Sequence, residues 1–297
     1  MTCHPAIIKR IIADFVDVRF RVGAINRESG QENAALLTVV PYMLLGSAAG
    51  LLSGLFGIGG GAVLVPILLI LFTARGLPED IMMQLAIGTS LTVISFTALS
   101  SVRAHSRLGN INWSLVARLV PGISGGALFG AAIAAQLTFT ALRTIFAVFL
   151  LLLAVQMILR FKPRASAPVP GWPATTMIGT GIGLLSSLVG VAGGAMITPF
   201  LYRWGLLMRQ AVGTSASCGL PLAIAGMLGY LVVGWSHPDL PAVTTGFIYW
   251  PAVFWVTLAS VFIAPLGAKL AQRLPDGTLR VIYIGFLLLV SISMLLT

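Results

Sequence analysis

The sequence predicts an all-α fold, a polytopic transmembrane helical bundle that consists of two homologous halves. Apolar residues make up 58% of the chain and charged residues only 9%. The mean hydropathy is +1.00, whereas about a quarter of the residues of a soluble domain are charged. Long charge-free runs and an internal repeat, described next, complete the prediction.

Eight runs of the chain contain no Asp, Glu, Lys or Arg. These runs are 33–74, 81–102, 119–142, 144–159, 165–202, 210–238, 240–268 and 281–297. A bilayer core needs about 20 apolar residues per helix, so nearly every run can hold one span and the two longest exceed one. The runs are continuously apolar and do not alternate as barrel strands do. We therefore expect about 8 to 10 helical membrane segments.

Residues 1–35 are predicted to form an amino-terminal tail with an amphipathic helix that lies at the membrane interface. Apolar residues recur there at helical spacing, with charged residues between them: Ile7, Ile8, Ile11, Ile12, Phe15 and Val18. A disordered tail is the alternative. A cleaved signal peptide is disfavoured, because the segment contains acidic residues and lacks an apolar core of about 7 to 15 residues.

An internal repeat covers most of the chain. Segment 50–66 (GLLSGLFGIGGGAVLVP) aligns with 183–199 (GLLSSLVGVAGGAMITP) and is identical at ten of seventeen positions. Three further blocks match in the same order: 86–90 with 211–215, 109–113 with 246–250, and 142–152 with 279–289. Preserved order over so many blocks indicates duplication. We predict two membrane repeats, 36–160 and 171–297, joined by a basic, proline-rich linker at 161–170.

The charges between the runs favour an inverted relation between the two halves. Each half opens with a long apolar run that contains a glycine cluster, at 58–61 and 191–194. If each run crosses once, a half has four spans and the halves are parallel. If each run is a broken pair of segments that turns at the glycines, a half has five segments and the halves are inverted. Only the inverted arrangement collects most basic loops on one side, as the positive-inside rule requires.

The remaining composition excludes several functions. The net charge of +10 does not indicate nucleic acid, because the basic residues stand singly or in twos and threes between apolar runs; orientation and anionic lipid headgroups account for them. The two cysteines, Cys3 and Cys218, share no spacing that suggests a disulfide framework or metal site. All acidic residues lie in tails or between spans, which disfavours a cation pathway. We predict no cofactor, no metal and no enzymatic activity.

Glycines form the first part of the predicted substrate-binding site: Gly57, Gly59, Gly60, Gly61, Gly190, Gly193 and Gly194. Glycine clusters interrupt a helix, and at membrane depth the freed peptide groups must be buried in protein or line a polar cavity. In transporters with inverted repeats, half-helices meet near the midplane and point their positive ends at an anionic substrate. Close helix packing is the alternative role of these glycines.

Hydroxyl groups form the second part of the predicted site. Thr89 and Ser90 match Thr214 and Ser215, and each pair directly follows a glycine. A hydroxyl offers an oxyanion a neutral hydrogen-bond donor, although a packing role with a bond to the helix backbone explains each residue equally well. Cys218 follows the second pair and completes the predicted set, with a buried apolar role as its alternative.

Taken together, the blocks resemble the sulfite exporter TauE/SafE family. They are GLFGIGGG at 54–61 followed by Val-Pro, AIGTS at 86–90, and HSRLGNINW at 105–113, each repeated in degenerate form. The resemblance implies a multi-pass carrier of the bacterial inner membrane that exports sulfite, organosulfonates or related small anions. In the second half, however, Ala192 replaces the glycine found at Gly59, so the site need not be symmetric.

Two other functions remain open at this stage. A non-transporting membrane assembly subunit would be equally hydrophobic, but broken helices would bring it no benefit at a cost of about 1 kcal/mol per helical glycine. Uptake of thiosulfate or sulfate-like anions would use the same residues in the opposite direction. Membrane lipids and the small anion are the expected partners, and the sequence is compatible with a homo-oligomer.

Overall fold

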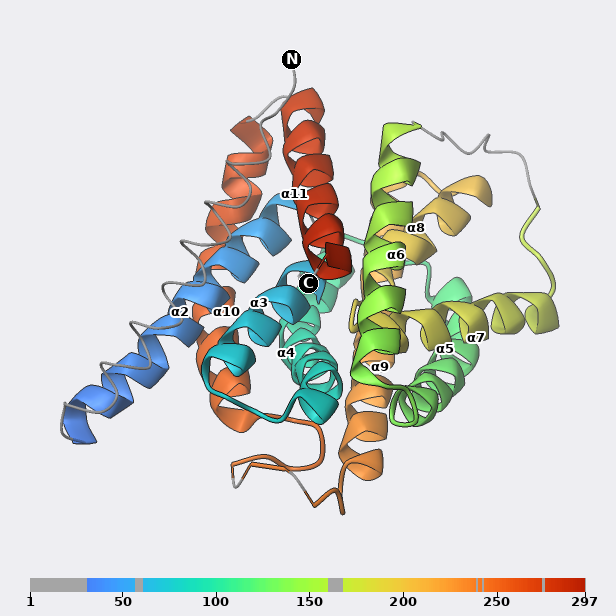
Figure 1. Cartoon of the computed structure of the whole chain (residues 1–297). Coiled ribbons are helices and arrows are strands. Elements are labelled where there is room, and N and C mark those ends of the chain that lie inside the picture. The colour runs from blue at the N-terminus through green and yellow to red at the C-terminus, as the bar shows by residue number, and fades with distance from the viewer. Residues whose placement is uncertain are drawn as a thin grey trace.

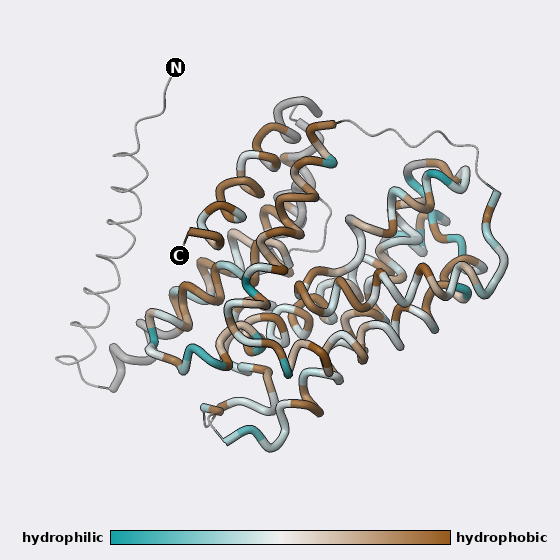
Figure 2. The backbone as a smooth tube through the Cα atoms, turned by 45° about the vertical axis from the view of Figure 1, so that its right-hand side comes forward, coloured by the Kyte–Doolittle hydropathy of each residue, from teal (hydrophilic) through white to brown (hydrophobic). Residues whose placement is uncertain are grey.

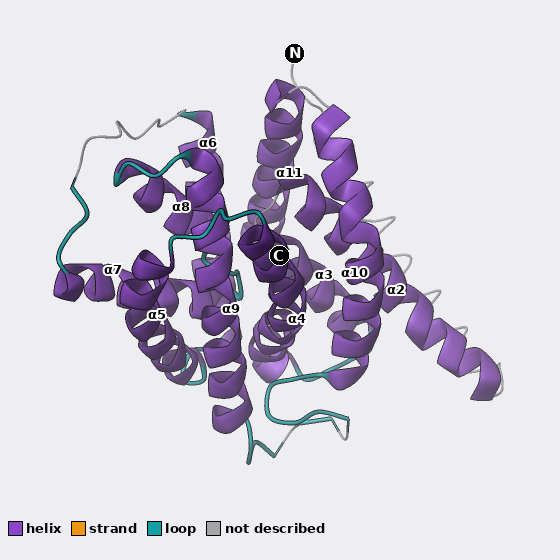
Figure 3. Ribbon diagram, turned by 180° about the vertical axis from the view of Figure 1, so that it is seen from behind, coloured by secondary structure: helices purple, strands orange, loops and turns teal. Residues whose placement is uncertain are grey.

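The computed structural model describes residues 31–56, 61–159, 168–238, 240–241, 243–273 and 276–296. Every regular element in these residues is an α-helix, apart from an isolated bridge between Thr244 and Tyr249 (Figures 1 and 3). This result confirms the predicted all-α class. The interfacial helix expected within the first 30 residues lies outside the described part of the chain.

Each half of the chain contributes five helices to the described structure. The first half forms α2 (Gln31–Phe56), α3 (Gly61–Ala74), α4 (Glu79–Arg107), α5 (Trp113–Ala134) and α6 (Phe139–Ile158). The second half forms α7 (Trp172–Val189), α8 (Gly194–Arg203), α9 (Met208–Val233), α10 (Trp250–Arg273) and α11 (Asp276–Leu296). Both halves therefore have one described helix before and another after their glycine cluster.

Several helices are long and apolar enough to cross a membrane. In the described residues these are Glu79–Arg107, Trp113–Ala134, Phe139–Ile158 and Arg209–Val233, and four shorter apolar helical stretches accompany them. Apolar residues also follow the outer helices along much of their length (Figure 2). Leu152, Phe262 and Leu289 are exposed on α6, α10 and α11, as lipid-facing side chains are. The protein is a multi-pass membrane protein.

Local sequence signals set the ends of equivalent helices in the same way. The helices α3 and α8 both end in a left-handed glycine, Gly76 and Gly205. The residue after each glycine donates its amide to the carbonyl five residues before it, from Leu77 to Phe72 and from Leu206 to Leu201. This is the Schellman arrangement, which closes the last carbonyls of a helix. The two halves thus share their helix ends as well as their order.

The two halves exchange their first helices. Helix α2 of the first half packs along α10 of the second, and α7 of the second half packs along α5 of the first. Gly46 and Gly50 make the α2–α10 contact possible: a Cβ at Gly46 would lie 2.6 Å from the Val256 carbonyl oxygen, and one at Gly50 would lie 2.8 Å from the Ser260 Cα. The Ser260 hydroxyl also donates to the Gly46 carbonyl at 2.9 Å.

The α5–α7 contact uses the equivalent positions. A Cβ at Gly179 would lie 2.7 Å from the Leu119 carbonyl oxygen, and one at Gly183 would collide with the Ile123 carbonyl. These four residues correspond to Gly46, Val256, Gly50 and Ser260 in the repeat alignment. The close approach of backbones through small residues is how membrane helices associate without a hydrophobic driving force.

Helices α6 and α11 pair at the outside of the bundle. They contact each other, the Ser291 hydroxyl donates to the Ala147 carbonyl at 2.8 Å, and they run in opposite directions in Figure 1. Since α6 and α11 are equivalent in the repeat, their opposite course is the arrangement that inverted halves would have. The side of the membrane on which each loop lies stays a prediction.

Candidate functional site at the helix breaks

The described break lies between α7 and α8. Helix α7 ends at Val189, and Gly190 follows in the left-handed conformation with φ +71°. The amide of Gly190 donates to the Ser186 carbonyl at 2.8 Å, and Gly193 precedes the first residue of α8. Glycine is required at Gly190 because a side chain there would be strained. The break is thus a tight, defined turn.

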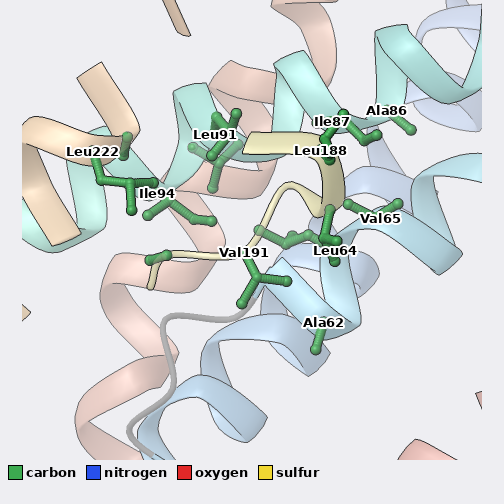
Figure 4. Packing of buried hydrophobic residues seen from close by; sticks show 14 of the residues in the cluster. Ala62, Leu64, Val65, Ala86, Ile87, Leu91, Ile94, Leu188, Val191 and Leu222 are labelled. Carbon is green, nitrogen blue, oxygen red and sulfur yellow. The ribbon is translucent and has the colours of Figure 1, made fainter. Parts of the chain in front are cut away.

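The break is buried among apolar side chains of several helices. Leu188 and Val191 flank the turn, and Figure 4 shows them among buried residues of α3, α4 and α9: Leu64, Val65, Ile87, Leu91 and Leu222. Irregular backbone at membrane depth is tolerated when protein surrounds it. This condition is met for 190–193.

The two glycine clusters meet at Gly61 and Gly190. Gly61 begins α3, and a Cβ there would collide with the Gly190 carbonyl and lie 2.8 Å from the Val191 Cα. The start of one half-helix therefore lies directly against the break of the other half. Three of the predicted site glycines, Gly57, Gly59 and Gly60, lie outside the described residues.

The two predicted serines hold the carbonyl groups of the break. The Ser90 hydroxyl on α4 donates to the Gly190 carbonyl at 3.0 Å, and the Ser215 hydroxyl on α9 donates to the Gly194 carbonyl at 3.2 Å. Both side chains are buried. The α4 and α9 helices thus fix both edges of the same turn with one hydroxyl each.

The two predicted threonines accept backbone amides from the opposite half. Thr89 accepts the amide of Tyr249 at 3.0 Å, and Thr214 accepts the amide of Asn112 at 2.9 Å. Tyr249 and Asn112 occupy the same position in the matched blocks 246–250 and 109–113. A hydroxyl that accepts one bond keeps its own hydrogen to donate. The reciprocal bonds tie each half to the segment that begins the fourth helix of the other.

The glycines before these threonines take part in the same contact. A Cβ at Gly88 would collide with the Phe247 carbonyl, and a Cβ at Gly213 would collide with the Asn110 carbonyl. Phe247 and Asn110 are again equivalent in the repeat. Each Gly-Thr-Ser block therefore makes two sets of contacts. Its glycine and threonine contact the opposite half, and its serine donates to a carbonyl of the break.

The remaining predicted residues lie around the break at different distances. A Cβ at Gly193 would lie 3.1 Å from the Leu222 Cδ1, and one at Gly194 would lie 3.6 Å from the Ser215 Oγ. Cys218 is fully buried on α9. Its neighbour Gly219 faces the break, because a Cβ added there would lie 3.7 Å from the Ala192 Cβ. Gly61, Gly190, Gly194, Ser90 and Ser215 thus converge, with the threonines just beyond them.

Sequence reasoning missed Tyr249 as a site residue. Its amide is bound to Thr89, its side chain is buried, and its hydroxyl accepts a hydrogen bond from Arg75. The signal was present in the matched blocks, because Tyr249 replaces Asn112 in an otherwise similar pentapeptide.

The site is polar without being charged. Hydroxyls and peptide groups supply its donors and acceptors, and in the residues searched no group of three or more His, Cys, Asp and Glu side chains could hold a metal ion. Such a set can solvate an anion through hydrogen bonds and peptide dipoles.

Comparison with known proteins gives a consistent result. The family model described as sulfite exporter TauE/SafE matches residues 42–294. A probable membrane transporter protein of Haemophilus influenzae is 39% identical over 86% of this chain and 97% of its own length. A probable membrane transporter protein of Methanocaldococcus jannaschii is 28% identical over 88% of this chain and 97% of its own length. No solved structure matches.

Proposed function

We propose, because the chain belongs to the sulfite exporter TauE/SafE family, that this membrane transporter carries small sulfur-containing or organic anions such as sulfite or organosulfonates. We place it in the bacterial inner membrane as a secondary transporter that works in the export direction. Transport then leaves the anion chemically unchanged.

One observation carries this proposal: the start of α3 in the first half meets the helix break of the second half, at Gly61 and Gly190, under a set of buried hydroxyls. Peptide groups at a helix break and hydroxyls without fixed charge are suited to an oxyanion that must bind and leave again. The helices α4 and α9 carry both the hydroxyls and the contacts to the opposite half. Movement of either helix would therefore change the break and the interface together.

An assembly subunit without transport is the weaker alternative. Such a protein needs a stable bundle, yet this chain interrupts its interior between α7 and α8 and keeps buried hydroxyls on the interruption. Uptake of thiosulfate or sulfate-like anions would use the same site, so substrate and direction must be measured together.

Transport in proteoliposomes tests the proposal. The purified protein is reconstituted and offered radiolabelled sulfite, sulfoacetate, thiosulfate and sulfate, with empty liposomes as the control. We expect saturable movement of sulfite or sulfoacetate, and protein of known orientation shows whether it leaves from the cytoplasmic side. A preference for thiosulfate or sulfate with inward movement would favour uptake. Movement of none of the four would contradict the proposal.

A further inference from the structure

We propose that Arg75, Tyr42 and Tyr249 form a second anion-binding site, at one mouth of the protein, which receives the transported oxyanion before or after the central site. This inference rests on the proposed function for the identity of the anion. The three residues come from the end of α3, from α2 and from the residue before α10. They therefore join both halves of the chain.

The three side chains are in direct contact. An Arg75 guanidinium nitrogen donates to the Tyr249 hydroxyl at 2.7 Å, and the guanidinium carbon lies 4.7 Å from the centre of the Tyr42 ring. The rings of Tyr42 and Tyr249 are 6.1 Å apart, and Phe72 packs edge-on against Tyr249 at 5.5 Å. Aromatic faces fix the position of a guanidinium without neutralising its charge.

Arg75 has no carboxylate partner in the part of the chain that the structure describes. It is half-buried, and its recorded contacts are the two tyrosines and backbone carbonyls of its own helix. Glu79 and Asp80 follow at the start of α4 but are exposed and form no ion pair with it. A half-buried cation without a counter-charge is a candidate for a binding role, and in Arg75 the two tyrosines add to that indication. What it lacks is an anion.

The Tyr42 hydroxyl is an independent sign of a missing ligand. Tyr42 is fully buried, and its hydroxyl lies beside Arg75 and Tyr249 without completing a hydrogen bond of standard geometry to any described group. Buried hydroxyls in proteins nearly always have a partner. The remaining guanidinium N–H groups are donors and the Tyr42 hydroxyl can donate as well, so an acceptor with several oxygens can satisfy all of them together. A small oxyanion has this chemistry.

Tyr249 links this cluster to the helix breaks. Its side chain accepts from Arg75, and its amide donates to Thr89 at 3.0 Å. The next residue, Ser90, donates to the Gly190 carbonyl at the break. If a bound anion attracts the Arg75 guanidinium, the hydrogen bond from Arg75 to Tyr249 changes. Tyr249 in turn is bonded to Thr89 on α4, next to the serine that contacts the break.

The equivalent place in the other half has no such cluster. The Schellman turn that ends α8 carries Trp204 at the position of Arg75, and the repeat alignment puts Thr175 and Asn112 at the positions of Tyr42 and Tyr249. The Thr175 hydroxyl donates to the Pro170 and Gly171 carbonyls at 3.1 Å, so it is satisfied within its own helix end. Arg203 ends α8 directly before Trp204, so what distinguishes the first half is the contact of Arg75 with two tyrosines.

Binding of radiolabelled sulfite to the full-length protein in nanodiscs of zwitterionic lipid tests the site. We expect Arg75→Gln to weaken binding roughly 10- to 100-fold, since a charge-assisted hydrogen bond is lost. Tyr42→Phe removes one neutral donor and should weaken binding roughly 3- to 10-fold. Arg143→Gln is the matched control, because Arg143 is also half-buried and lies 5.6 Å from the Phe139 ring; its effect should stay below roughly twofold.

Several outcomes would overturn the site. Unchanged sulfite binding in folded Arg75→Gln, or an equal loss in Arg143→Gln, contradicts it. A lipid headgroup could offer the same phosphate oxygens, so the wild type and Arg75→Gln are also assayed for bound anionic lipid in nanodiscs that contain phosphatidylglycerol. Loss of bound lipid with unchanged sulfite binding assigns the cluster to lipid. If Arg75→Gln does not fold, Tyr42→Phe alone decides by the same criterion.

The test separates this inference from the proposed function. Transport of sulfite by the wild type together with unchanged binding and transport in Arg75→Gln keeps the function and removes the mouth site. If the wild type transports none of the four sulfur anions, the proposed function is wrong. The cluster is then titrated with nitrate, phosphate and acetate, and it fails as well if Arg75→Gln binds all of them as the wild type does.

Discussion

Thr89 in the first half and Thr214 in the second accept an amide from the opposite half at 3.0 and 2.9 Å, but the residues that donate differ. Asn112 is exposed and caps α5 with its side chain, whereas Tyr249 is buried and its hydroxyl accepts a hydrogen bond from Arg75. The backbone contact is common to both halves and the side-chain chemistry is confined to one. The comparison teaches that the duplicated contacts hold the bundle together, while the unmatched side chains make the two halves chemically different.

The first test concerns the premise of this comparison, which is that the two halves have inverted orientations in the membrane. Reporter tags inserted in the 161–170 linker and in the 203–209 loop should both be found in the cytoplasm, because the positive-inside rule places these basic loops together. Accessibility of the tags in intact and permeabilised cells gives the answer. Opposite sides for the two tags would restore parallel halves with four spans each.

The next largest effect is expected where both halves use glycine for close backbone contact. Gly50→Leu and Gly183→Leu should each abolish folded protein, at a cost above about 4 kcal/mol, because each new side chain meets the backbone of the partner helix. Size-exclusion chromatography and the yield of monodisperse protein measure it. Gly181→Leu is the control, since Gly181 is exposed with open space around it. Loss in one half and tolerance in the other would show that the exchanged helices are not equivalent.

The two sides of the break should respond differently to the same substitution. Gly61→Leu places a side chain against the Gly190 backbone and should prevent folding, whereas Gly193→Leu meets only side-chain ends. We expect Gly193→Leu to remain folded after repacking that costs about 1 to 3 kcal/mol, and to lose transport because it fills the break. Melting temperature and proteoliposome uptake separate the two effects. Full transport by Gly193→Leu would remove the break from the substrate path.

The smallest effect should sharpen the comparison of the two threonines. Thr89→Val leaves the amide of buried Tyr249 without its acceptor and should cost about 1 to 3 kcal/mol of stability. Thr214→Val should cost less, about 1 kcal/mol or below, because Asn112 is exposed and water can replace the hydroxyl. Thermal unfolding of both variants in one detergent gives the difference, with Thr89→Ser as the conservative control. Equal destabilisation would contradict the proposed asymmetry.

The sequence contained enough to predict the helices and the repeat, but not how the halves interlock. The lengths of the apolar runs and the positions of the charges predict the spans. The matched blocks align Gly88, Thr89 and Ser90 with their counterparts in the second half. That α2 packs on α10 depends on long-range contacts at Gly46 and Gly50, which no local pattern encodes. The meeting of Gly61 with Gly190 was expected in kind, as two breaks at one centre, although the contact atoms were not.

The candidate site was only partly accessible to the same reasoning. The hydroxyls beside the glycines bind peptide groups of the protein, and their role toward an anion stays a prediction. No sequence pattern singles out Arg75, because its contacts are with Tyr42 and Tyr249, which are 33 and 174 residues away in sequence (75 − 42 and 249 − 75). Such a cluster is created by the fold.

The exchanged helices also set the order in which the protein can be completed during synthesis. Helix α7 finds its partner α5 already made, but α2 must wait until α10 is synthesised, 210 residues after Gly46 if Val256 is taken as its partner (256 − 46). At about 5 to 20 residues per second, this interval is roughly 10 to 40 seconds. During that time Gly46 and Gly50 lack the α10 helix against which they pack, so α2 is made early and docks late.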